Sequence, residues 1–151
     1  EMPRLDRASA RLWSMRLNQG LEADGGRVWV RQPELSHGSP GAPLVNGGSQ
    51  SGKTLTADGF TTGYTARIGQ FFSILTGSHR YGYRLSDTFR VGAGGSVTLG
   101  FEPALRAEPG DNDILEFGKP FIEGRLADVP EEVISEAPLT EPFQFTIREA
   151  R

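Results

Sequence analysis

The stretch from Gly47 to Thr54, GGSQSGKT, has residue types and spacing that suit phosphate binding. It matches the pattern G-x-x-x-x-G-K-[ST], in which glycines let backbone N–H groups surround phosphate oxygens and a lysine neutralises their charge. The chemistry would be binding or hydrolysis of a nucleoside triphosphate, with Lys53 on the phosphates. Such a loop works only where a buried parallel strand precedes it and a helix begins at the Lys-Thr pair.

The flanking sequence does not predict that context. The run before the loop, SPGAPLVN, has too few apolar residues for a buried strand, and LTADGFTTGY after it is interrupted by two glycines and rich in threonine, a poor helix former. Alternating strands and helices are also absent. We therefore predict that the match is fortuitous, that Lys53 is exposed, and that Gly47, Gly48 and Gly52 serve a turn.

The two histidines, His37 and His79, are the next candidates for chemistry. A zinc or iron site would need both to converge with a carboxylate, and we predict instead that both are solvated loop residues. The chain has no cysteine, which excludes disulfides and thiolate zinc sites.

Carboxylate pairs occur at Glu131-Glu132 and at Asp111 and Asp113. Two carboxylates can share acid–base work, but these lie in Pro/Gly-rich connections, which favours solvated charges. The sequence also lacks the G-x-S-x-G elbow of many serine hydrolases. We predict no catalytic, metal-binding or cofactor-binding residue, no cofactor and no enzymatic activity.

Aromatic residues gather at Phe71-Phe72, Tyr81, Tyr83 and Phe89. Adjacent strand residues point to opposite faces, so Phe71 and Phe72 cannot both enter one core. Core packing explains most such clusters, whereas exposed aromatic faces suit a sugar or a partner protein. An alternative function therefore stays open: a carbohydrate- or receptor-binding β-module that uses Phe72, Tyr81 or Tyr83.

The composition favours one all-β domain over residues 1–151. The length suits a single core, and 20 Gly and 10 Pro indicate many turns between short elements. We predict an antiparallel β-sandwich or barrel-like module with long Gly/Pro-rich loops and little helix. No apolar run approaches the roughly 18 residues of a membrane helix, and the net charge of -3 argues against a nucleic-acid partner.

Alternation of apolar and polar residues places the expected strands. Residues 1–31 are predicted to form a hairpin from strands at 12–17 and 27–31, with no helix of ordinary length anywhere in the chain. Residues 32–59, dense in Pro, Gly, Ser and Asn, are predicted to be a long irregular loop. Residues 60–151 hold the remaining strands, which we expect at 64–74, 81–91, 96–101, 113–117 and 142–148, with 131–135 as a helical turn or a strand.

Charge is unevenly placed along the chain. Residues 1–101 carry 11 Lys/Arg and 7 Asp/Glu, a net +4, whereas residues 102–151 carry 5 and 12, a net -7. Two interpretations stay open: two solvated surfaces of one domain, or complementary faces that meet between neighbouring copies. The second predicts that reversing the charges of Asp128, Glu131 and Glu132 disturbs assembly.

Several segments resemble one family of proteins, and they occur in the family's order. The resemblance lies in GSPGAPLVNGGSQSGKTLTADGF at 38–60, in 68–74 and 83–85, in GGSVTLGFEPALR at 94–106, in EPGDND at 108–113 and in FQFTIREA at 143–150. Over residues 10–150 the chain is similar to distal tail proteins and related tail-tip, or baseplate, structural proteins of long-tailed bacteriophages and phage-like particles.

The resemblance implies a structural role without catalytic residues. Such proteins are β-sandwich or barrel-like modules that form a ring, usually of six copies, joining the tail tube to the hub and receptor-binding parts. The expected partners are therefore copies of the chain itself, the tail tube protein, and the hub and receptor-binding proteins, and the expected location is the virion tail tip. A closed ring needs two different surfaces on each copy, because its interfaces are head-to-tail.

Overall fold

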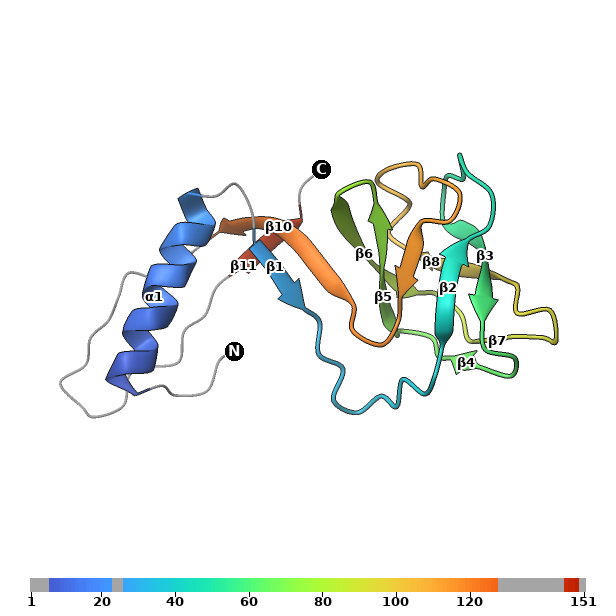
Figure 1. The fold of residues 1–151 in the computed structure, drawn as a ribbon, viewed down its shortest axis with the longest axis horizontal. Coiled ribbons are helices and arrows are strands. Elements are labelled where there is room, and N and C mark those ends of the chain that lie inside the picture. Colours follow the sequence, from blue (N-terminus) through green and yellow to red (C-terminus); the bar gives the residue numbers. More distant parts are fainter. Residues whose placement is uncertain (1–5, 23–25, 128–145, 150–151) are drawn as a thin grey trace. The chain divides into compact units, whose positions relative to one another are not determined.

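The computed structural model describes residues 6–22, 26–127 and 146–149 (Figure 1). Within them the chain forms one helix followed by a series of short strands. The elements are α1 (Arg7–Glu22), β1 (Gly26–Trp29), β2 (Gly41–Val45), β3 (Thr54–Phe60), β4 (Thr65–Ala66), β5 (Phe71–Thr76), β6 (His79–Leu85), β7 (Phe89–Arg90), β8 (Val97–Glu102), β9 (Ile114–Glu116), β10 (Phe121–Ala127) and β11 (Thr146–Glu149).

Six strands close into an antiparallel barrel in the order β2-β3-β8-β6-β5-β9 (Figure 1). Its longest pairing is the β5–β6 hairpin, which runs in continuous register from Phe71 opposite Arg84 to Thr76 opposite His79. A turn containing Gly77, at φ 62°, connects the two strands. The prediction of an all-β antiparallel fold is confirmed, with a closed barrel as its centre.

The barrel core follows from strand alternation. Inward-facing residues of β3, β5, β6, β8 and β9 are almost entirely buried, whereas many of the residues between them reach the surface. Aromatic rings fill much of the interior: Phe72 stacks on Phe117 with centroids 5.0 Å apart, and Phe101 meets the edge of Phe72 at 5.7 Å. Offset and edge-on contacts of this kind stabilise a core beyond the area they bury.

The first β-hairpin of the barrel depends on a glycine. The register between β2 and β3 shifts between Gly41 and Leu44, and the two backbones approach closely at Gly59. This glycine has φ +71°, and a Cβ atom added there would lie 2.5 Å from the Ala42 carbonyl oxygen. A side chain would therefore force β2 and β3 apart, which explains why Gly59 stands inside a strand.

The remaining strands form two smaller sheets. β4 and β7 pair in a two-stranded sheet, and β1, β10 and β11 form a three-stranded sheet with β10 in the middle. The chain divides into two compact units: residues 28–122 form one, and the described residues of 1–27 and 123–150 belong to the other. The prediction from the sequence was a single domain over residues 1–151.

The helix corrects the prediction for the first 31 residues. The strand at 12–17, the hairpin built on it and the absence of an ordinary helix are all wrong, because residues 7–22 form α1. Asp6 caps this helix, and its Oδ1 accepts the Ser9 backbone N–H at 2.8 Å. That hydrogen bond is the main reason why the pKa of the Asp6 carboxyl is lowered.

Other strand predictions had mixed outcomes. The irregular loop predicted at 32–59 contains β2 and β3, so that prediction is wrong for 41–45 and 54–59. The runs at 64–74 and 81–91 each split into two strands, and those at 27–31, 96–101 and 113–117 correspond to β1, β8 and β9. Residues 146–149 form β11, whereas 131–135 and 142–145 lie outside the described residues.

Candidate interaction surface

The loop with the phosphate-binding pattern is a hairpin turn between β2 and β3. The Gln50 side chain fills its interior. The Gln50 Oε1 atom accepts the Thr56 N–H at 2.8 Å, and Nε2 donates to the carbonyls of Gly47, Asn46 and Thr56 at 2.8, 3.0 and 3.2 Å. An amide group thus takes the place that an anion would need.

The loop's own N–H groups are also used inside the protein. Gly47 N–H donates to Asp111 Oδ1 at 2.8 Å, and Ser49 N–H donates to the Pro109 carbonyl at 3.1 Å. A phosphate-binding loop instead points several such groups at its ligand. The prediction that the glycines serve a turn is confirmed by the positive φ values of Gly47 and Gly52, 86° and 85°.

Lys53 is exposed, as predicted, and its Nζ pairs with Glu102 Oε1 at 2.7 Å. The next residue, Thr54, begins a strand that pairs with β8, whereas the phosphate-binding motif requires a helix there. The prediction of a fortuitous match therefore agrees with the local structure on both sides of Lys53.

The histidines lie in different settings. His79 is exposed at the start of β6, as predicted for a solvated residue, although it lies in a strand. His37 is half-buried, and its Nδ1 atom is buried without a hydrogen-bond partner among the residues that the structure describes, so the prediction of a solvated side chain is wrong there. Over 6–22, 26–127 and 146–149, no group of three or more His, Asp or Glu residues is arranged to hold a metal ion.

Of the two carboxylate pairs, only Asp111 and Asp113 lie in the described residues, and each accepts a backbone N–H. Asp113 Oδ2 accepts the Gly110 N–H at 2.8 Å, while Asp111 receives the Gly47 N–H described above, so both carboxylates organise loops. Glu131 and Glu132 lie outside the described residues.

Two of the three aromatics proposed for sugar binding belong to the core. Phe72 is 0% exposed and Tyr83 is 2% exposed, so neither can offer a ring face to a ligand. The Tyr83 hydroxyl oxygen accepts the Arg106 backbone N–H at 3.3 Å, and burial raises the pKa of its phenol. Tyr81 is half-buried and packs against the core, whereas Phe71, on the outer face, carries the Arg84 guanidinium over its ring at 5.4 Å.

A row of alternating cations and aromatic rings lies outside the barrel core. Arg31 Cζ is 5.3 Å from the centroid of the Trp29 ring, and Lys119 Nζ is 5.2 Å from the same ring. Lys119 Nζ is also 5.7 Å from the centroid of the Phe121 ring, and Arg80 Cζ lies 5.9 Å from the same centroid. We call these five residues the cation–aromatic row.

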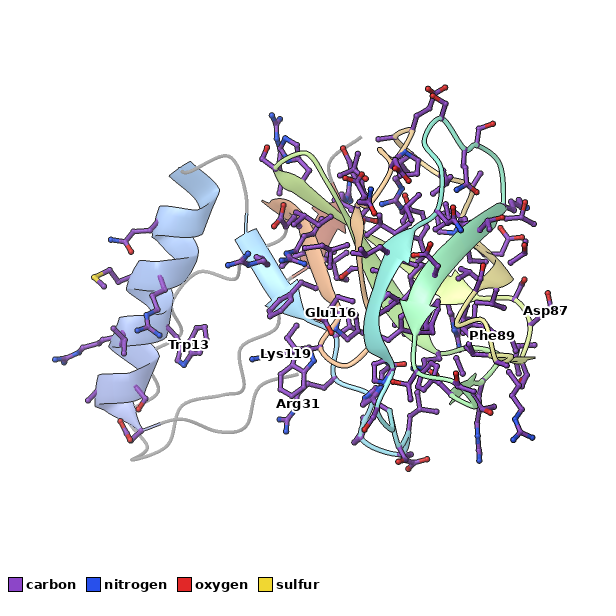
Figure 2. All side chains as sticks on the ribbon, turned by 45° about the vertical axis from the view of Figure 1, so that its right-hand side comes forward. Trp13, Arg31, Asp87, Phe89, Glu116 and Lys119 are labelled. Carbon is purple, nitrogen blue, oxygen red and sulfur yellow. The ribbon has the colours of Figure 1, made fainter. Side chains whose placement is uncertain are left out.

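Backbone and side-chain hydrogen bonds fix the segment that carries Lys119 and Phe121. Glu116 Oε1 accepts the N–H groups of both Gly118 and Lys119 at 2.9 Å, and the Phe121 N–H donates to Ser73 Oγ at 3.3 Å. Ser73 itself is fully buried. Figure 2 shows Arg31 and Lys119 on one side of the barrel and Asp87 and Phe89 on another.

The Trp29 strand is joined to the same segment, because Val30 N–H donates to the Pro120 carbonyl at 2.9 Å. Gln32 then anchors the following chain: its Oε1 accepts the Phe71 N–H at 2.7 Å and its Nε2 donates to the Phe71 carbonyl at 3.2 Å. Arg31 is therefore flanked by two anchored residues: Val30, bonded through its backbone to Pro120, and Gln32, bonded through its side chain to Phe71 of β5.

The exposed cations of the row are not neutralised by an ion pair within the described residues. Arg31 and Lys119 are exposed, and Trp29 is 39% exposed. Neither Arg31 nor Lys119 forms an ion pair with any residue in the described part of the chain. This surface was not predicted from the sequence, because its cations and rings come from separate segments, RVWVR at 27–31, HRY at 79–81 and GKPF at 118–121.

No family model matches the chain, and a comparison with curated proteins found no match. In the described residues, no helix has the length and apolar character needed to cross a membrane.

Proposed function

We propose that the chain is a virion structural protein at the tail tip, which forms or joins a ring connecting the tail tube to the hub and receptor-binding parts. It acts by assembly and needs no cofactor. Its partners on this proposal are neighbouring copies, the tail tube protein, and the hub and receptor-binding proteins.

The observation that carries this proposal is the ordered set of segments that resemble distal tail proteins. Residues 38–60 supply β2, its turn and β3, residues 68–74 enter β5, and residues 94–106 contain β8. The strands β2, β3, β5 and β8 all belong to the closed barrel. Because the resemblance falls on the elements that define the module, and in the same order, it favours the same kind of module.

A second observation supports a role in contacts between proteins. The exposed surface carries tryptophan and arginine, the residue types enriched at the energetic centres of interfaces, and they are arranged as the cation–aromatic row. Ile68 and Ile114 are also exposed, at 65% and 47%. Arg31 and Lys119 form no ion pair within the described residues, and exposed rings beside such cations are typical of a surface completed by a partner.

The alternative, a carbohydrate-binding module, loses its main residues with the burial of Phe72 and Tyr83. Trp29 is more exposed than Phe72 and Tyr83, but Arg31 and Lys119 lie over its ring. Sugar stacking needs an open ring face, so these cations would have to move first.

The proposal is tested by deleting the coding sequence for this chain and examining the particles produced. We expect heads and tail components to form but functional tails to be absent, with normal particles restored by supplying the chain in trans. Mass spectrometry of purified wild-type particles should detect the chain in a fixed ratio to the tail tube protein. Normal, infectious particles without the chain would overturn the proposal.

A further inference from the structure

We propose that the cation–aromatic row is the docking surface for the acidic segment 128–141 of a neighbouring copy of the chain. The row supplies Arg31 and Lys119 as exposed cations, and the Trp29 and Phe121 rings lie beneath them. The inference rests on the proposed function in one respect, because it assigns the segment to a second copy in a head-to-tail ring.

The geometry of the row favours carboxylates over sugars or bases. Arg31 and Lys119 both lie within 5.3 Å of the Trp29 ring centroid, so the groups that meet an incoming ligand first are the cations. Guanidinium and ammonium groups donate several hydrogen bonds to a carboxylate, and stacking on rings holds the two side chains in place. A base or a sugar would instead need a free ring face.

Charge complementarity identifies the occupant. Residues 128–141, DVPEEVISEAPLTE, contain five carboxylates and no Lys or Arg, together with Val, Ile and Leu. The segment lies outside the described residues. The carboxylates of the segment match the exposed cations Arg31 and Lys119.

The same chain thus carries a cationic surface on its barrel unit and an acidic segment elsewhere. Two different complementary surfaces on each copy are the requirement for a closed ring. On this proposal, the positive charge of the first part of the sequence acts through Arg31 and Lys119, and the negative charge of the second part acts through residues 128–141.

The chain's own lysines allow a direct test, because Lys53 and Lys119 are the only two. A carbodiimide joins a lysine amine to a carboxylate in direct contact. Full-length protein, mixed from ¹⁵N-labelled and unlabelled copies, would be treated at low salt and high protein concentration. Mass spectrometry would then identify which carboxylates are linked to each lysine, and mixed-label peptide pairs would reveal links between copies.

Lys53 supplies an internal positive control. Its Nζ lies 2.7 Å from Glu102 Oε1, so a link within one copy is expected in every sample. For Lys119 we expect mixed-label links to Asp128, Glu131, Glu132, Glu136 or Glu141, and their yield should fall as salt screens the charges. The variant Lys119→Arg, which keeps the charge but removes the amine, should abolish these links and keep the Lys53–Glu102 link.

A charge exchange separates specific docking from general attraction. The paired change Arg31→Glu with Lys119→Glu should weaken association of copies, measured by analytical ultracentrifugation, about tenfold. Adding Glu131→Lys and Glu132→Lys should restore it, whereas adding Lys53→Glu should not. These surface changes leave the barrel core intact, and circular dichroism would verify the fold.

Two results would overturn the inference. One is a Lys53–Glu102 link without any Lys119 link to 128–141 of another copy, including the case in which Lys119 links only within its own copy. The other is unchanged association of the Arg31→Glu, Lys119→Glu variant. Neither result bears on location in the virion, which the deletion experiment tests separately, so failure of the two proposals can be told apart.

Discussion

Gln50 holds both backbone groups of Thr56: its Oε1 accepts the Thr56 N–H at 2.8 Å, and its Nε2 donates to the Thr56 carbonyl at 3.2 Å. The side chain thereby imitates a strand neighbour inside the turn between β2 and β3. The residues that spell a phosphate-binding loop are thus organised around an internal amide.

Replacing Gln50 by Ala should lower the free energy of unfolding by about 1–3 kcal/mol, because partly buried backbone groups lose their partners. Removing the exposed ion pair with Lys53→Ala should cost less than about 1 kcal/mol. Urea unfolding followed by circular dichroism measures both. A larger loss for Lys53→Ala than for Gln50→Ala would contradict this account of the loop.

Phe72 should be essential to the barrel. Its ring stacks on Phe117 at 5.0 Å and is fully buried, so Phe72→Ala should reduce the free energy of unfolding by about 3–5 kcal/mol. Tyr81→Ala, at a half-buried position, is the matched control and should cost less. If Phe72→Ala instead left the unfolding midpoint unchanged and abolished binding on a glycan array, the assignment of Phe72 to the core would be wrong.

The stability of the barrel should fall at alkaline pH. Burial raises the pKa values of Tyr64 and Tyr83 above 10.0, because it disfavours the phenolate. Their contribution to stability is fully present below the pKa of the unfolded chain and is lost as pH rises through the higher folded-state values. The free energy of unfolding of the Tyr83→Phe variant, measured by urea unfolding at a series of pH values, should fall less steeply above pH 10 than that of the wild type. Parallel curves for the two proteins would contradict a contribution from the Tyr83 phenol.

Asp6 should stabilise the N-terminus of α1. Asp6→Ala removes the acceptor for the Ser9 N–H, so we expect weaker helix formation in the far-ultraviolet circular dichroism signal. Asp6→Asn keeps a capping oxygen and should retain most of that signal. Equal loss of helix signal in both variants would indicate that the negative charge, rather than the hydrogen bond, is the important feature.

The sequence predicted the barrel strands better than the first segment. The strand predicted at 96–101 corresponds to β8, in which the buried Leu99 and Phe101 alternate with less buried residues. In residues 12–17 the same alternation was misleading, because six residues are too few to distinguish a strand from a helix. The more informative signals were Asp6 as an N-cap and the Ala, Arg, Leu and Met content of residues 7–22.

The strands within 32–59 were missed for a different reason. Gly41, Pro43 and Gly59 are poor strand residues on average, yet the close approach of Gly59 to Ala42 requires a glycine in this hairpin. The cation–aromatic row could not be predicted, since Trp29, Arg80 and Lys119 are separated by 90 positions from first to last and only the closed fold brings them together.

The central claim, a structural role at the tail tip, is tested most directly by immunogold electron microscopy of intact particles from the source, with an antibody raised against this chain. We predict gold at the distal end of the tail. Gold on the capsid would contradict the tail assignment. Unlabelled particles, opened to expose internal epitopes and probed with an antibody that detects the denatured chain in infected cells, would contradict the virion role as a whole.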